Sequence, residues 1–264
     1  MRLLDRADVV ALDKPAGVSM ATSSRSTDGS GAEVVRRLLA ACGEPDDPEL
    51  LLVHRLDVGT SGVVLLARGE AAHRALSLAF QNRRVRKTYR ALVWGHPAPA
   101  QGVLDQPLGR DPRDGRRMKV RAGGKAARTR YRTLARFPSA ADLDLSPETG
   151  RTHQIRVHLS AHGHPIVGDD LYGGATRWRG VRDPSLRRAL AAVGRPLLHA
   201  ARVEIPELGI DVAAPLPEDY RRALAALSLS PRGTRTGNGK GTTRPPSKTS
   251  RRASASRAGG RRYR

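Results

Sequence analysis

The sequence centres on one stretch, His54-Arg55-Leu56-Asp57-Val58-Gly59-Thr60-Ser61-Gly62, which runs into Val63-Val64-Leu65-Leu66-Ala67. The apolar run predicts a buried strand. Thr60, Ser61 and Gly62 are typical of a turn that lets the backbone bend sharply. Asp57 is therefore expected in a tight loop that feeds a rigid sheet, where scaffolds often hold a reacting group. The alternative is an aspartate that caps the turn and pairs with Arg55.

Hydrophobic periodicity elsewhere predicts strands with helices inserted between them. The fold class expected is α+β, a mixed and largely antiparallel sheet with flanking helices. We expect a helix that Thr152 N-caps and Gly163 ends, and a hairpin over 111–124. The other expected helices are 32–41, 70–81 and 218–227, and the expected strands are 9–12, 51–53, 63–67, 87–94, 127–136, 141–145 and 197–203.

The charge balance points to a polyanionic partner. The chain has 264 residues, with 47 Lys and Arg against 25 Asp and Glu. Each cation placed near a phosphate releases a condensed counterion, so this excess favours nucleic acid. Aromatic residues make up only 3% of the chain, which disfavours a binder built on rows of stacking rings. Arginine and shape must do more of the recognition.

Several classes of protein are disfavoured by simple counts. Cys42 is the only cysteine, so an intramolecular disulfide and a multi-cysteine metal site are excluded, and an inert buried thiol is expected. No apolar run reaches membrane-spanning length. The charged N-terminus lacks a secretory apolar region, and a cytoplasmic protein is expected.

The composition changes at Ser230. The last 35 residues contain eleven Lys or Arg, no acidic residue and many Gly, Pro, Ser and Thr. Such a segment cannot bury enough surface to offset its ordering entropy. We therefore expect a catalytic domain over residues 1–229 and a basic disordered tail over 230–264.

Six sequence blocks, in order, carry a resemblance to a known family. They are Asp13-Lys14-Pro15-Ala16-Gly17, the segment 54–67, Lys87-Thr88-Tyr89 through Gly95, Glu148-Thr149-Gly150-Arg151-Thr152-His153-Gln154-Ile155-Arg156 through Leu159, Gly163-His164-Pro165-Ile166-Val167-Gly168-Asp169, and Leu198-His199-Ala200. Over roughly residues 7–225 the chain closely resembles the RluA-type family of RNA pseudouridine synthases. Many members carry an extra N-terminal RNA-binding module, which we do not expect here because the first expected strand begins near residue 8.

The resemblance implies isomerisation of uridine to pseudouridine within an RNA chain. The N1–C1′ bond breaks, the uracil rotates, and C5 bonds to C1′. No atom is gained or lost, so no redox or group-transfer cofactor is implied. The sequence shows no P-loop and no dinucleotide fingerprint, which agrees with this expectation.

Three catalytic residues follow from the resemblance. Asp57 matches the family's essential aspartate, and attack on C1′, attack on C6 and removal of a C2′ proton remain open. Arg156 matches the arginine of Gln-Ile-Arg and is expected to pair with Asp57; a surface helix arginine is the alternative. Tyr89 matches the tyrosine of Lys-x-Tyr and could stack on uracil or transfer a proton, unless it is a core tyrosine.

Three further residues are expected to bind substrate. Leu198 would form an apolar wall of the uracil pocket, or else be an ordinary core leucine. Arg55 and His54 would contact the flipped nucleotide or its phosphates, and Arg55 could fill the space that the base vacates. Capping of the local loop is the alternative for His54.

A cluster of histidines invites a metal site, which we do not expect. His153, His158, His162 and His164 fall within twelve residues. No carboxylate shares their helix face, and the family needs no metal. Packing, capping or phosphate contact is the expected role.

The leading hypothesis is thus an RNA-modifying isomerase that acts on ribosomal or transfer RNA, with ribosomal RNA favoured. We expect a monomer without an obligate protein partner or membrane. The alternative is a catalytically silent RNA-binding or ribosome-assembly factor on the same fold. A glycosidase is disfavoured because Asp57 lacks a second carboxylate at recognisable spacing.

Overall fold

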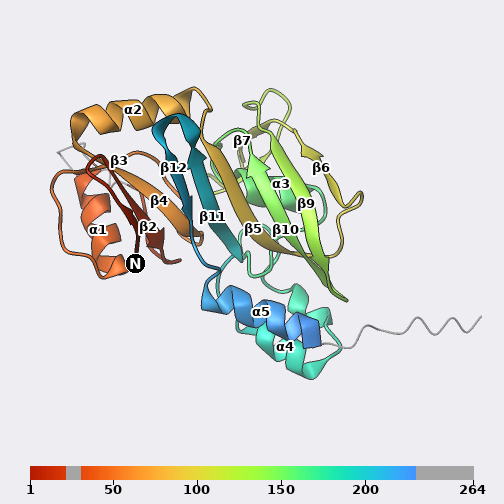
Figure 1. The fold of residues 1–264 in the computed structure, drawn as a ribbon. Helices are drawn as coiled ribbons and strands as arrows, with labels where there is room; N and C mark the ends of the chain where they lie inside the picture. The colour runs from red at the N-terminus through yellow and green to blue at the C-terminus, as the bar shows by residue number, and fades with distance from the viewer. Residues whose placement is uncertain (22–30, 230–264) are drawn as a thin grey trace, which may run out of the picture. The chain divides into compact units, whose positions relative to one another are not determined.

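The computed structural model describes residues 1–21 and 31–229. Its largest feature is a twisted sheet (Figure 1), whose main path runs β1-β2-β4-β11-β5-β10-β9-β6. Two more strands join it, since β12 pairs with β11 and β3 pairs with β4. The strands are β1 (Arg2–Asp5), β2 (Val9–Lys14), β3 (Leu50–Leu52), β4 (Ser61–Arg68), β5 (Arg86–Trp94), β6 (Gln101–Leu104), β9 (Thr129–Arg136), β10 (Ala140–Pro147), β11 (Leu198–Ile205) and β12 (Ile210–Ala213).

Helices and a hairpin surround this sheet. A separate two-stranded sheet is formed by β7 (Leu108–Arg110) and β8 (Met118–Val120), where the sequence predicts a hairpin. The helices are α1 (Ala32–Cys42), α2 (Gly69–Gln81), α3 (Gln154–Ala161), α4 (Pro184–Ala191) and α5 (Glu218–Leu229), with short 3-10 turns at Arg177–Gly180 and Pro206–Leu208. The expected α+β class, with a largely antiparallel sheet, is confirmed; β4 and β11 form a parallel pair.

The apolar run after Asp57 is buried on both faces, as its continuity predicts. Val63 to Ala67 are all inaccessible to solvent. Val64 and Leu66 pack with α1, whereas Val63 and Leu65 pack with α2. Alternate side chains of β4 therefore hold one helix on each face of the sheet.

The turn before β4 begins three residues earlier than predicted. The amide of Thr60 donates to the carbonyl of Asp57 at 3.0 Å, so the reversal spans Asp57 to Thr60. Ser61 and Gly62 already belong to β4 and pair with His199 and Ala200 of β11. At Gly62, φ is +112°, and a Cβ atom would lie 2.2 Å from the carbonyl oxygen of Ala200. The glycine thus permits close strand pairing rather than the bend itself.

The start of α3 also differs from the prediction. The N-cap of α3 is His153 and not Thr152. His153 has a φ of 54°, and its side chain makes no capping hydrogen bond. Gln154 turns back instead, and its Oε1 accepts from the amide of Arg151 at 3.0 Å and the hydroxyl of Thr149 at 2.6 Å. The loop before α3 is therefore held by a glutamine inside the helix.

Candidate active site

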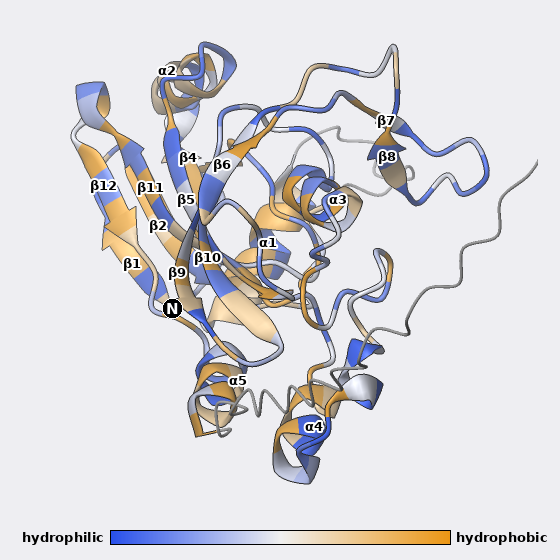
Figure 2. Cartoon of the chain, turned by 90° about the vertical axis from the view of Figure 1, so that its right-hand side faces the viewer, coloured by the Kyte–Doolittle hydropathy of each residue, from blue (hydrophilic) through white to orange (hydrophobic). Residues whose placement is uncertain are grey.

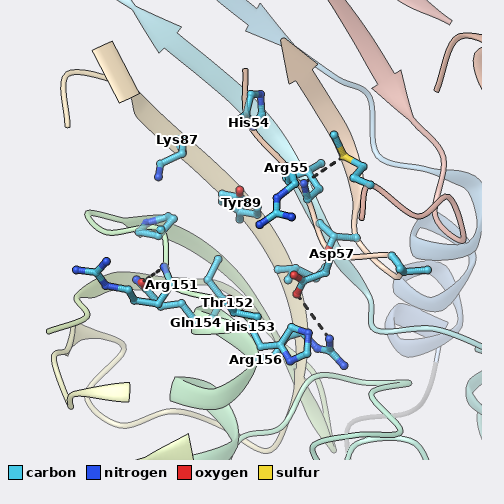
Figure 3. Close-up of a pocket in the computed structure, with 18 of the residues that line it drawn as sticks. His54, Arg55, Asp57, Lys87, Tyr89, Arg151, Thr152, His153, Gln154 and Arg156 are labelled. Carbon is cyan, nitrogen blue, oxygen red and sulfur yellow. Dashed lines mark hydrogen bonds and ion pairs between the residues drawn. The ribbon is translucent and has the colours of Figure 1, made fainter. Parts of the chain in front are cut away.

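A cavity of about 470 Å³ opens between the Asp57 loop, β5 and the start of α3. It is lined by all six residues that the sequence predicts for the site: His54, Arg55, Asp57, Tyr89, Arg156 and Leu198. These come from the loop between β3 and β4, from β5, from α3 and from β11. Figure 3 shows Asp57, Tyr89 and Arg156 grouped around the same space.

The buried ammonium group of Lys14 holds the Asp57 loop in place. Lys14, at the end of β2, is fully buried, and its Nζ donates to the carbonyl oxygens of Thr60 at 2.8 Å and Pro15 at 3.0 Å. The pKa of Lys14 is lowered to about 8, mainly by burial and then by the nearby charge of Arg195, while Asp57 opposes the shift. The amide of Gly17 also donates to Val58 at 2.8 Å. The block Asp13-Lys14-Pro15-Ala16-Gly17 thus supports the loop that carries Asp57, a role that the sequence analysis did not assign.

Asp57 and Arg156 meet as expected, but loosely. A terminal nitrogen of Arg156 lies 3.6 Å from an Oδ atom of Asp57, which is an ion pair without a close hydrogen bond. The Asp57 side chain is 26% exposed, whereas that of Arg156 is 8% exposed. One side of the Asp57 carboxylate therefore still faces solvent, whereas the guanidinium of Arg156 is almost completely buried.

The closer partner of Arg156 is Asp169, which sequence reasoning left without a role. The Nε and one terminal nitrogen of Arg156 donate to the two carboxylate oxygens of Asp169 at 2.8 and 2.9 Å. Asp169 is fully buried and also accepts from the amides of Leu171 and Tyr172, each at 3.1 Å. A bidentate pair of this kind fixes the guanidinium plane. The sequence feature that could have indicated this role is Gly168-Asp169, an acidic residue in the fifth block that follows α3 closely in the chain.

Tyr89 lines the cavity beside Asp57. Burial raises the pKa of Tyr89, and the negative charge of Asp57 raises it further. The phenol therefore keeps its proton at neutral pH and can act as a hydrogen-bond donor. Its ring also packs against two hydrophobic clusters, so the core role and the cavity-facing role coexist.

His54 has a structural partner. Its Nε2 accepts the amide hydrogen of Leu65 at 2.9 Å, and its ring stacks on Phe80 with the ring centres 4.6 Å apart. Burial lowers the pKa of His54 to about 3, and Lys87 lowers it as well. The imidazole is therefore neutral and ties the Asp57 loop to β4, as the loop-capping alternative describes. Contact between His54 and substrate stays a prediction.

Leu198 and Arg55 differ in their surroundings. Leu198 is 3% exposed, belongs to the main hydrophobic cluster and also lines the cavity. It is therefore both a core leucine and part of the apolar cavity wall. Arg55 is exposed at the cavity. Among the described residues, no carboxylate forms an ion pair with Arg55, Lys87 or Arg151, all three of which line the cavity. The open side of the site is thus positively charged and suited to phosphate.

The four clustered histidines do not converge on one site, although the rings of His162 and His164 lie 5.7 Å apart. His158 is buried between the Thr129 hydroxyl and the Gln106 carbonyl, each 3.0 Å away, and His164 lies 3.0 Å from the Trp94 carbonyl. Of these four histidines, His153 is the one that lines the cavity. Over residues 1–21 and 31–229, no group of three or more His, Cys, Asp or Glu is arranged to hold a metal. Cys42 is half-buried rather than buried, and its thiol approaches the Asp13 carbonyl at 3.5 Å.

The arrangement can carry out acid–base or nucleophilic chemistry on a polyanion. It combines a carboxylate, a guanidinium fixed by a second carboxylate, a protonated phenol and free cations at the opening. Within the described part of the chain, no helix is both long enough and apolar enough to span a bilayer.

Comparison with known proteins gives a consistent result. A sequence profile for the family described as RNA pseudouridylate synthase matches residues 8–161. An uncharacterised RNA pseudouridine synthase of Mycobacterium bovis is 40% identical over 228 residues, which cover 83% of this chain and 70% of that protein. Ribosomal large subunit pseudouridine synthase D of Xanthomonas campestris is 40% identical over 229 residues, covering 83% and 66%. The structure of human RNA pseudouridylate synthase domain containing 4 aligns with a TM-score of 0.65 at 27% identity, covering 86% of this chain and 92% of the human one.

Proposed function

Because the chain belongs to the RluA-type family of RNA pseudouridine synthases, we propose that Asp57 is the carboxylate with which it isomerises uridines in ribosomal RNA. One observation supports this assignment above the others. Asp57 is an acid at the cavity that is held in an ion pair with Arg156 and lies beside Tyr89.

The surroundings of Asp57 suit its proposed role. Arg156 places a positive charge 3.6 Å from the carboxylate that every proposed route uses. Since Asp169 fixes Arg156 from the buried side, the guanidinium stays in place when Asp57 reacts. Covalent attack on C1′ or C6 and removal of a C2′ proton all start from this ionised group. Tyr89 would contact the uracil ring or donate its proton, and Leu198 would form the apolar side of the pocket.

Ribosomal RNA is the proposed substrate class. The relatives named for the ribosomal large subunit cover 83% of this chain at 40% identity in one case and 84% at 38% identity in another. The cations Arg55, Lys87 and Arg151 at the cavity would contact phosphates next to the flipped uridine. Transfer RNA is the alternative substrate.

We propose a monomer that works in the cytoplasm without a protein partner, and the assembly of the site within one chain supports the monomeric state. The cavity residues come from β5, β11, α3 and the loop before β4 of the same polypeptide. No proposed step needs a residue from a second protein.

The decisive experiment compares the wild type with Asp57→Asn on transcripts of large-subunit ribosomal RNA and on transfer RNA. The amide keeps the shape but removes the charge, so isomerisation should be lost while RNA affinity stays within a few-fold. Asp8→Asn, at an exposed position, is the matched control and should keep full activity. Turnover by Asp57→Asn above a few per cent of wild type would rule out Asp57 as the reacting group. Binding without isomerisation by the wild type would favour the silent RNA-binding factor.

A further inference from the structure

Tyr172 occupies a position between the basic hairpin and the reacting residues. It follows Asp169 in the loop after α3, is 5% exposed, and does not itself line the cavity. It belongs to a small hydrophobic cluster separate from the three clusters of the main sheet. The buried members are Leu108, Ala127, Val157 and Tyr172, and Met118, Val120 and Leu171 pack around them.

On one side Tyr172 holds the hairpin. The amide of Met118 in β8 donates to the Tyr172 hydroxyl oxygen at 2.9 Å. The guanidinium of Arg117, in the loop before β8, lies 5.6 Å from the centre of the Tyr172 ring. Figure 2 shows β8 beside α3 on the same side of the molecule. The hairpin is thus attached to the body of the protein through this tyrosine and the small cluster.

On the other side Tyr172 supports the active site. Its ring lies 5.0 Å below the guanidinium carbon of Arg156, and its hydroxyl is 2.8 Å from Nδ1 of His153. Because the hydroxyl oxygen accepts from Met118, its hydrogen is available to donate to His153. The His153 proton then resides on Nε2. Burial lowers the pKa of His153; the charge of Asp57 opposes this shift and that of Arg156 adds to it, and the lowered pKa agrees with a neutral ring.

The backbone of His153 adopts a conformation that needs support from its surroundings. Its φ of 54° is unusual for a residue other than glycine and carries a cost in free energy. The surrounding contacts must compensate for that cost, and the Tyr172 hydroxyl is one of them. His153 lies next to Arg156 at the cavity, where Figure 3 shows both beside Asp57.

The hairpin itself is suited to sense RNA. Arg113, Arg116 and Arg117 are exposed in the loop between β7 and β8, and Arg121 and Lys125 follow β8 on the surface. Only Arg116 among these five forms an ion pair with a described carboxylate, that of Asp114. Cations without carboxylate partners are free to neutralise phosphates.

We propose that Tyr172 is a positioning residue that couples RNA binding at the β7–β8 hairpin to the placement of Arg156 and His153 beside Asp57. The proposal rests on the proposed function, since the hairpin is taken to bind the RNA that the site modifies. Phosphates bound at the hairpin would hold it in the position that the structure shows, with the Met118 amide on the Tyr172 hydroxyl and Arg117 against the Tyr172 ring. Tyr172 in turn orients His153 and supports the guanidinium of Arg156.

Two substitutions separate the hydroxyl from the ring. Tyr172→Phe removes both hydrogen bonds but keeps the ring under Arg156, and should lower the single-turnover rate at saturating RNA about fivefold. Tyr172→Leu also removes the cation–π contact and should lower that rate at least about 30-fold. Tyr131→Phe is the matched control, since Tyr131 is equally buried, its hydroxyl donates to the Pro99 carbonyl at 3.1 Å, and it does not line the cavity. It should leave the rate unchanged.

A second readout does not depend on activity. Trypsin cleavage after Arg113 or Arg116 reports how firmly the hairpin is seated, and both Tyr172 variants should be cut faster than wild type and control. Unchanged cleavage in Tyr172→Phe would overturn the proposal even if Tyr172→Leu fails to fold. An inactive wild type with faster cleavage of the variants would contradict the proposed function and leave the hairpin attachment supported.

Coupling is tested by adding Arg113→Gln and Arg116→Gln. Removing these charges should weaken RNA affinity in every background. In the wild-type background it should also lower the saturating rate, because the hairpin is then seated less often. In the Tyr172→Leu background it should leave that rate unaltered, because the connection is already broken. Rate effects that multiply in the combined variant would show that the two positions act independently.

Discussion

Arg156 serves two carboxylates, and its replacement should have two separable effects. Arg156→Met leaves Asp169 buried without a counterion, so the free energy of unfolding should fall by about 3–5 kcal/mol. It also removes the cation next to Asp57, so the rate should fall at least about 100-fold. Adding Asp169→Asn should restore much of the stability but none of the rate. Recovery of the rate in the double variant would show that Arg156 acts only as a structural partner of Asp169.

His199 predicts a pH dependence of stability. It is fully buried, accepts from the Ser61 hydroxyl at 2.9 Å through Nδ1 and donates to the Ala214 carbonyl at 3.3 Å through Nε2. Burial is the main reason that its pKa falls from 6.5 to about 4. Between pH 6.5 and about pH 4, His199 is therefore protonated in the unfolded chain and neutral in the folded chain. The stability that neutral His199 contributes to the fold is complete above pH 6.5 and is lost as the pH falls toward 4.

The size of this effect can be measured by denaturant unfolding at pH 7 and pH 5. At pH 5 the refused proton should cost the wild type about 2 kcal/mol. His199→Gln, which cannot titrate, should be less stable at pH 7 but should lose less between the two pH values. An equal loss in both proteins would mean that His199 is not the titrating group.

At the residue scale, the sequence was sufficient to bring Asp57, Tyr89 and Arg156 together. Each lies in a sequence block that resembles a block of the family, and the resemblance implied that the three side chains share one site. The two supporting residues, Lys14 and Asp169, were missed because their function consists of tertiary contacts. Lys14 is a surface-type residue by composition, and only the fold shows that its ammonium is buried under the Asp57 loop.

Among the elements, β4 offers the sharpest test of why glycine is needed. In Gly62→Ala, the new methyl group would meet the Ala200 carbonyl at the parallel pairing of β4 with β11. Unfolding measurements should show a loss of more than about 3 kcal/mol. Gly17→Ala is the control, because Gly17 has a φ of +90° with nothing within 4 Å of an added Cβ. Gly17→Ala should be destabilised only by backbone strain. Equal losses of stability in the two variants would show that the close approach of β11 to Gly62 adds little to the cost of Gly62→Ala.

Most long elements and the three-residue strand β3 were predictable, whereas several other short strands were not. The helices with an amphipathic face and the strands with an apolar run were expected near their observed bounds. The strands β1, β6 and β12, each four residues long, carry too few positions to show a period. α4 was also missed, although Asp183 caps its N-terminus and Pro184 opens it, a pair of signals visible in the sequence.

For the whole molecule, the charge of the C-terminal segment gives the broadest prediction. Residues 230–264 lie outside the described residues, and their eleven cations can contribute counterion release. Deleting them should weaken RNA binding and flatten the slope of log affinity against log salt, by roughly 0.7 for each lost single-strand phosphate contact. The saturating single-turnover rate should not change. Identical slopes for full-length and shortened protein would show that the segment does not touch RNA.

The position of β11 has a consequence for how the protein is made. It is the strand that joins β4 to β5 at the centre of the sheet, yet its contact between Ser61 and His199 spans 138 residues of chain. At about 5–20 residues per second, ribosomes would finish β4 on the order of ten seconds before β11 emerges. During that interval the edge of β4 that later faces β11 is paired only at one end, by β3. The edge of β5 that later pairs with β11 also has no partner. Unpaired edges of this kind are sites of aggregation, so the nascent chain should depend on chaperones until its last strands have left the ribosome.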